Sequence, residues 1–128
     1  MAWSILLVDD SRIVRAVMKR TLELAGVPVA ALWEASGGEE ALAVLERETV
    51  DLVFTDLMMP GMDGEALLGE MRRRGLVERI PVVVVSSAGG TPRERQLRAS
   101  GARELLRKPF TPEEVLAVVQ RVMQEVTA

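Results

Sequence analysis

Short hydrophobic runs alternate with longer amphipathic stretches along this chain. Residues 4–8, 52–54 and 82–85 form continuous apolar runs, which are typical of parallel strands covered on both faces. Two further runs, at residues 29–35 and 104–107, contain more small or polar side chains, as expected of strands with less complete cover. The hydrophobic pattern therefore predicts five strands.

The stretches that follow these runs have the periodicity of amphipathic helices. Apolar residues recur at helical spacing within residues 13–22, 41–45 and 67–71. Gly26 and Pro28 follow the first of these stretches, and both residues commonly mark the end of a helix. Each of these predicted helices should pack one apolar face on the sheet.

The signals for the last two helices differ in strength. Thr111 at a capping position, Pro112 at the first helical position and two acidic residues in the first turn predict a helix that begins after Thr111. Residues 91–99 contain one large apolar side chain, Leu97. Because so little apolar surface is available for burial there, we expect that helix to be loosely anchored and mobile.

Alternation of five strands with five helices predicts an α/β fold with a doubly wound parallel sheet. Ligands of such sheets bind beyond the carboxyl ends of the strands, where the strand order reverses. Asp9 and Asp10 follow the first strand, Asp56 the third, Ser86 the fourth and Lys108 the fifth. These five residues should therefore meet at one edge of the sheet.

Composition limits the chemistry available there. The chain has 128 residues, enough for one domain over residues 1–128, and a formal net charge of −3. It contains neither Cys nor His, which excludes thiol nucleophiles, disulfides, imidazole bases and metal sites made from these residues. The charge gives no reason to expect nucleic acid or a membrane surface as a partner, and no run approaches the roughly 18 apolar residues of a membrane helix. We therefore expect a cytoplasmic protein.

Three neighbouring carboxylates repel one another and favour a bound cation. A hard divalent ion with oxygen ligands, most naturally Mg²⁺, suits them. With Lys108 the charges of the site balance, so an incoming phosphoryl group would meet the metal, the lysine, the Ser86 hydroxyl and backbone N–H groups. Since a carboxylate is already ionised at neutral pH, one of the three could act as a nucleophile and form an aspartyl phosphate.

Four motifs, each at the predicted end of a strand, resemble those of a known family. They are Asp9-Asp10, Asp56 followed by LMMPGMDG, Ser86 after an apolar strand, and Lys108-Pro109-Phe110. Together they are similar to the receiver domain of two-component response regulators, and the resemblance covers the whole chain. It implies a CheY-like (βα)5 fold of flavodoxin type with the strand order 2-1-3-4-5.

The resemblance also assigns roles to the acidic residues. Asp56 resembles the phosphoacceptor. Asp10, Asp56 and the backbone carbonyl of Met58 resemble the Mg²⁺ ligands of the family, with Asp9 acting largely through water.

Lys108 and Ser86 complete the set that the resemblance implies. Lys108 resembles the lysine that pairs with the phosphoryl group. Ser86 stands at the position of the switch Ser or Thr, whose hydroxyl moves to bond a phosphoryl oxygen. The resemblance further implies a cis peptide bond between Lys108 and Pro109.

On this basis the chain is expected to be a stand-alone receiver, because it ends soon after its last predicted helix. The phosphoryl group would come from a sensor histidine kinase or a histidine phosphotransfer protein, and the signal would pass to an unidentified protein by direct contact. The chain would catalyse its own phosphorylation and dephosphorylation without being an enzyme for another substrate. It would act as a monomer or a weak homodimer.

Three positions depart from the family pattern. Leu105 stands where receivers usually carry Tyr or Phe, so we expect signalling to depend more on the loop after the fourth strand and on displacement of the helix at 91–99. Met58 and Ala88 occupy the two positions that often govern hydrolysis of the aspartyl phosphate, and neither side chain orients a water molecule. We therefore expect a long-lived phosphoryl group.

Other interpretations of the same residues stay open at this point. Asp10 and Ser11 could cap the first helix, Asp56 could be a turn residue, and Asp63 suits a helix start. The missing aromatic residue leaves room for an interaction module that acts independently of phosphorylation. A nucleotide-binding fold or an aspartyl phosphatase is disfavoured, because the first turn lacks glycines and no second acid lies two residues after Asp56.

Overall fold

A computed structural model describes residues 2–87 and 91–127 of the chain. Its five strands form one parallel sheet in the order β2-β1-β3-β4-β5, which confirms the predicted fold class. The strands are β1 (Trp3–Val8), β2 (Val29–Ala35), β3 (Leu52–Asp56), β4 (Val82–Ser86) and β5 (Glu104–Arg107).

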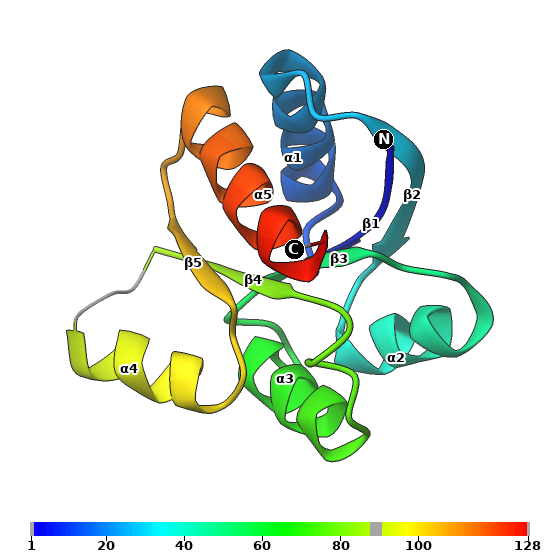
Figure 1. Ribbon diagram of the computed structural model, residues 1–128. Helices are drawn as coiled ribbons and strands as arrows, with labels where there is room; N and C mark the ends of the chain where they lie inside the picture. Colours follow the sequence, from blue (N-terminus) through cyan, green and yellow to red (C-terminus); the bar gives the residue numbers. More distant parts are fainter. Residues whose placement is uncertain (1, 88–90, 128) are drawn as a thin grey trace.

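Five helices connect and flank the strands. They are α1 (Arg12–Ala25), α2 (Gly38–Arg47), α3 (Gly64–Arg73), α4 (Thr91–Ala99) and α5 (Pro112–Thr127). Helices α1 and α5 cover one face of the sheet, whereas α2, α3 and α4 lie on the other (Figure 1). Both faces of the sheet are therefore covered, as its continuous apolar strands require. None of the described helices combines the length and hydrophobicity of a membrane span.

The sheet separates two hydrophobic cores. Alternate residues of a strand point to opposite faces, so Val84 belongs to the core under α2, α3 and α4, whereas Val83 and Val85 belong to the core under α1 and α5. Phe54 is a buried member of the second core, and Trp33, which is partly buried, packs at the margin of the first.

Two strands reach further than the hydrophobic pattern predicted. Strand β3 includes Asp56, and β4 includes Ser86. Sheet hydrogen bonds continue beyond the carboxyl ends of these strands. The amide of Leu57 donates to Val85 O at 3.1 Å, and the amide of Lys108 donates to Ser86 O at 3.0 Å. The main chain at these polar residues is therefore held by the sheet rather than by a loop.

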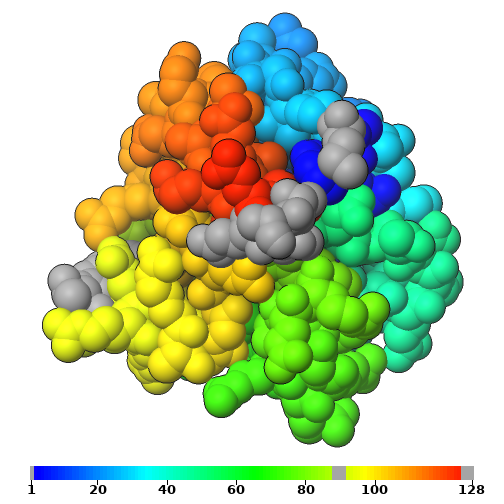
Figure 2. All heavy atoms as spheres, in the orientation of Figure 1, coloured from blue at the N-terminus to red at the C-terminus, as the bar shows by residue number. Residues whose placement is uncertain are grey.

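Helix α4 has the weakest apolar anchor, as predicted from its sequence. Leu97 is its buried hydrophobic residue among the side chains that the structure describes, at 2% exposure. Its other attachments include surface ion pairs, such as Arg93 with Glu65 of α3 at 2.7 Å and Arg107 of β5 with Glu94 at 3.5 Å. In Figure 2, α4 lies at the margin of the molecule beside α3 and β5.

Candidate functional site at the carboxyl edge of the sheet

The register of the strands brings the predicted residues to one edge. Asp9 directly follows β1, and its amide donates to Ala35 O at 3.1 Å, so the end of β2 fixes its position. Asp56 ends β3 opposite Val85 of β4. Lys108 directly follows β5 and lies beside the same edge.

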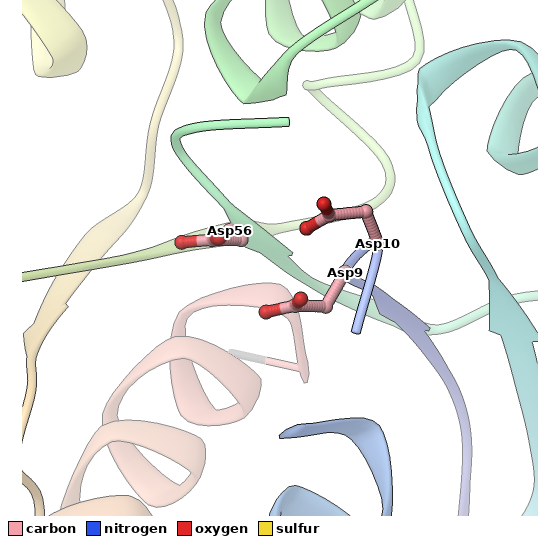
Figure 3. Close-up of side chains that lie close together, drawn as sticks. All are labelled: Asp9, Asp10 and Asp56. Atoms are coloured by element: carbon pink, nitrogen blue, oxygen red, sulfur yellow. The ribbon is translucent and has the colours of Figure 1, made fainter. Parts of the chain in front are cut away.

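Asp9, Asp10 and Asp56 form a cluster that we call the acidic trio. One carboxylate oxygen from each residue lies within 4.8 Å of the corresponding oxygens of the other two. The three side chains leave their backbones toward the same side (Figure 3). Asp9 is buried, Asp56 is partly buried and Asp10 is exposed, so the cluster opens to solvent on the side of Asp10.

Asp9 is the most constrained member of the acidic trio. Its Oδ1 accepts a hydrogen bond from the amide of Ser11 at 2.9 Å. Burial raises the pKa of Asp9, the Ser11 amide and the Lys108 charge lower it, and the charges of Asp56 and Asp10 raise it further. The ionised form of Asp9 is therefore disfavoured by its burial, and a nearby cation would stabilise it.

Among the described residues, Lys108 is the cation that forms ion pairs with carboxylates of the acidic trio. Its Nζ lies 3.3 Å from Asp56 Oδ1 and 3.9 Å from Asp9 Oδ2. The amide of Leu57 also donates to Asp56 Oδ1, at 3.0 Å. Both hydrogen bonds of the Asp56 carboxylate thus end on Oδ1, and no residue in the described part of the chain donates to Oδ2.

A tight turn after Asp56 depends on two glycines. Gly61 has φ = 72°, in the left-handed region that favours glycine. Gly64 begins α3, and a Cβ there would lie 2.2 Å from the carbonyl oxygen of Asp56. The turn therefore brings the start of α3 against the main chain of Asp56, and Asp63 caps the helix by accepting from the amide of Ala66 at 2.9 Å.

The donor set of the acidic trio suits Mg²⁺. The three residues offer only carboxylate oxygens, which are the ligands that this ion prefers. Ligands about 2.1 Å from Mg²⁺ lie about 3 to 4 Å apart, so the trio needs only a small contraction or an intervening water molecule to share one ion. Met58, the further predicted ligand, is 70% exposed, and its carbonyl accepts no hydrogen bond from the described residues.

Ser86 lies at this edge of the sheet but faces the core under α2, α3 and α4. It is 8% exposed and lines a hollow of about 110 Å³ between α4 and β5, together with Leu97 and Leu105. Leu105 is partly buried and packs on the core below α4. Movement of the Ser86 hydroxyl toward a phosphoryl group stays a prediction.

Other details of the sequence prediction have mixed outcomes. The Lys108-Pro109 bond is cis, as predicted. Ser11 caps α1 by accepting from the amide of Val14 at 3.2 Å, so the capping interpretation is right for Ser11. Ala88 lies outside the described residues.

One neighbour of the site was missed by sequence reasoning. Arg15 of α1 shares a cavity of about 30 Å³ with Asp9, Asp56, Lys108 and Phe110. In the sequence Arg15 is one of several charged residues on an amphipathic helix, and no motif distinguishes it. Only the fold reveals that its side chain turns back toward the end of β1.

Comparison with known proteins identifies the family. The family model of the response regulator receiver domain matches residues 5–120. The chain therefore belongs to the receiver domain family of response regulators, as the sequence motifs predicted.

Relatives of known sequence support this assignment. The chain is 40% identical over 121 residues to the response regulator protein FleR of Pseudomonas aeruginosa, covering 94% of this chain and 24% of FleR. It is 38% identical over 113 residues to the gliding motility regulatory protein of Myxococcus xanthus, covering 88% of this chain and 14% of that protein. The chain thus spans about a quarter or less of the length of these relatives.

Solved structures agree on the fold. The chemotaxis protein CheY4 of Vibrio cholerae has a TM-score of 0.83 and 30% identity, and the match covers 95% of this chain and 99% of that chain. The receiver domain of the Francisella response regulator 1452 has a TM-score of 0.84 and 27% identity, with 96% and 98% covered.

Proposed function

We propose that this receiver is a phosphorylation-dependent switch in which Asp56 accepts the phosphoryl group. The observation that carries the proposal is the clustering of the Asp9 and Asp10 carboxylates with that of Asp56, with Lys108 Nζ 3.3 Å from Asp56 Oδ1. A bound divalent cation and a lysine around one nucleophilic carboxylate form an arrangement suited to phosphoryl transfer.

The residues would share the work of the transfer. Asp56 Oδ2, which accepts no hydrogen bond from a described residue, attacks the phosphorus of a phosphohistidine on the donor. A P–O bond forms, the P–N bond breaks, and the imidazole nitrogen of the donor keeps the electron pair. Lys108 donates to the phosphoryl oxygens, and the Ser86 hydroxyl is proposed to move toward them.

A cation would complete the charge balance. Asp9, Asp10, Asp56 and the Met58 carbonyl would hold Mg²⁺, with Asp9 acting largely through water. When bound, Mg²⁺ supplies positive charge that offsets the trio and the incoming phosphoryl oxygens. Ionised Asp9, whose pKa is raised chiefly by burial, would be stabilised by that charge.

The proposed partners follow from the same chemistry. The chain contains no His, so a phosphohistidine donor must be a separate protein or domain, namely a sensor histidine kinase or a histidine phosphotransfer protein. Phosphorylation adds about 1.5 to 2 negative charges at the sheet edge, and a downstream protein would read the resulting change by contact. We place this exchange in the cytoplasm. The chain would catalyse only its own phosphorylation and dephosphorylation.

A labelling experiment tests the proposal. The protein is incubated with acetyl phosphate and Mg²⁺, and intact mass spectrometry should detect one added phosphoryl group. Asp56→Ala should abolish the label. Asp51→Asn is the matched control, because Asp51 lies at the opposite end of β3, where its carboxylate accepts from the amide of Ser4 at 2.8 Å.

Two outcomes would contradict the proposal. One is labelling that survives Asp56→Ala. The other is a wild-type chain that stays unlabelled yet binds its downstream partner, which would favour the phosphorylation-independent interaction module that Leu105 leaves open. A pull-down with and without beryllofluoride distinguishes the second case.

A further inference from the structure

The side chain of Arg15 links three elements beside the acidic trio. Its Nε donates to Glu34 Oε1 near the end of β2 at 2.9 Å, and its Nη1 donates to the main-chain carbonyl of Asp9 at 2.5 Å. The Arg15 side chain is 14% exposed, whereas that of Arg20, paired with Glu23 on the same helix, is 68% exposed. Arg15 is therefore an internal clamp, unlike the surface arginine one turn and a half away.

The carbonyl that Arg15 binds belongs to the peptide joining Asp9 to Asp10. Because a peptide group is planar, fixing its oxygen also fixes the direction in which the chain enters Asp10. The amide of Asp9 is held separately by Ala35 O at 3.1 Å. That amide belongs to the preceding Val8–Asp9 peptide, so the bond from Arg15 is an attachment of the Asp9–Asp10 peptide itself.

Charge neutralisation does not explain this arrangement. The guanidinium of Arg15 is offset by Glu34, to which it is directly bonded. Lys108, at 3.3 Å from Asp56 and 3.9 Å from Asp9, is the cation that contacts the carboxylates of the trio. The contact of Arg15 with the trio is to a main-chain oxygen, so its effect on a bound ion is through geometry.

We propose that Arg15 is a positioning residue for the cation site, holding the Asp9–Asp10 peptide so that both carboxylates face a bound Mg²⁺. This inference rests on the proposed function, since it assumes that the acidic trio binds the ion. Groups that orient the ligands of a metal typically change its affinity about 10- to 100-fold when they are removed.

Position and charge predict changes of opposite sign. If Arg15 acted only as a nearby positive charge, its removal would strengthen Mg²⁺ binding, because a repulsive interaction with the cation would be lost. If Arg15 positions the peptide, its removal weakens binding. A single affinity measurement therefore separates the two roles.

Isothermal titration calorimetry with Mg²⁺ on the full chain tests this inference. Arg15→Gln should raise the dissociation constant about tenfold. Arg15→Lys should recover only part of this loss, because one ammonium group replaces a fork that reaches two acceptors. Arg20→Gln, which removes the same charge from α1 without touching Asp9, should leave the affinity near that of the wild type or slightly tighter.

A second readout separates positioning from loss of fold. Thermal unfolding checks that each variant is folded, and amide NMR shifts of Asp10 and Ser11 without metal should change in Arg15→Gln but not in Arg20→Gln. If Arg15→Gln does not fold, Arg15→Lys, which keeps the charge but loses the fork, should still give a smaller loss of Mg²⁺ affinity.

The outcomes for the inference and for the proposed function are distinct. Unchanged or tighter Mg²⁺ binding by folded Arg15→Gln, or by Arg15→Lys in its place, overturns the positioning role while the metal site stands. A wild-type chain that does not bind Mg²⁺ overturns the proposed metal site, and the role of Arg15 with it.

Discussion

Gly64 supports the acidic trio without contributing a functional group. A Cβ at this position would lie 2.2 Å from Asp56 O and 3.0 Å from Leu57 Cα, so backbone rather than a flexible side chain would have to move. We expect Gly64→Ala to lower the free energy of unfolding by about 1–3 kcal/mol, as overpacking does. The same change should slow labelling of Asp56 by acetyl phosphate.

Gly69 provides the matched control on the same helix. A Cβ there would meet no atom within 4 Å, so Gly69→Ala gains helix propensity without a clash. We expect it to raise the free energy of unfolding by up to about 1 kcal/mol. Urea denaturation of both variants checks these signs, and equal effects would contradict the contact argument.

Asp9 should lower the stability of the metal-free protein. Its pKa is raised in the fold, chiefly by burial, so the folded state binds a proton more tightly than the unfolded state. This penalty is fully present above the raised pKa and disappears as pH falls through it toward the ordinary value of 3.8. Asp9→Asn should therefore stabilise the protein at pH 7 while weakening Mg²⁺ binding.

Urea denaturation in EDTA tests the pH dependence of this effect. The stability advantage of Asp9→Asn over the wild type should be largest at neutral pH and should shrink at about pH 4. Asp51→Asn serves as the control for general loss of negative charge. An advantage of Asp9→Asn that grows on acidification would show that the sign is wrong.

Met58 should prolong the life of the aspartyl phosphate. Its side chain is 70% exposed, two residues after Asp56, and a thioether does not orient a water molecule for attack. We expect Met58→Asn to speed loss of the phosphoryl group, and each tenfold change corresponds to about 1.4 kcal/mol in the barrier. Decay followed by mass spectrometry checks this, and equal lifetimes for both proteins would disprove it.

At the scale of elements, α4 is the helix most easily displaced. Its described anchors include the buried side chain of Leu97 and exposed ion pairs. Each exposed ion pair contributes at most about 1 kcal/mol to stability. Adding beryllofluoride with Mg²⁺ should therefore alter amide hydrogen exchange more in residues 91–102 than in α2. Unchanged exchange in residues 91–102 would refute the prediction that signalling involves α4.

Helix α1 carries an exposed apolar stripe. Ile13, Val17 and Leu24 are 76%, 55% and 61% exposed, and their spacing places them on one face of the helix. Helix α1 begins two residues after Asp10, beside the acidic trio, so a protein that delivers a phosphoryl group to Asp56 must come close to its first turns. Ile13 and Val17 should therefore contact the donor.

Substitutions along this stripe test the docking prediction. The double variant Ile13→Ser with Val17→Ser should slow transfer from a phosphorylated donor protein about tenfold, because apolar burial in the complex is lost. Labelling by acetyl phosphate, which needs no docking surface, should be unchanged. Leu24→Ser, at the far end of the same face, is the control, and equal slowing by it would argue against donor contact near the site.

At the scale of the whole molecule, the sequence was sufficient for the fold and for the convergence of the acidic trio. Continuous apolar strands and helical periodicity are local signals, and parallel topology brings every strand's carboxyl end to one edge. The meeting of Asp9, Asp56 and Lys108 at the carboxyl edge of the sheet could therefore be predicted from the sequence.

Contacts made by long side chains across elements could not be predicted in this way. The link from Arg15 to Asp9 and Glu34 depends on how α1 lies over the first two strands, which no motif encodes. The side to which Ser86 points depends on the register of β4, where a shift by one residue would turn the hydroxyl to the opposite face.

The two cores on either side of the sheet give the site a mechanical meaning. Asp56 and Lys108 line the cavity on the side of α1, whereas Ser86 lines the hollow beside α4. A phosphoryl group bonded to both Lys108 and Ser86 would connect residues on opposite faces of the sheet. It would thereby link the core under α1 and α5 to the core under α2, α3 and α4. Loosening either layer would then weaken retention of the phosphoryl group, so its lifetime would report on how firmly the two halves are joined.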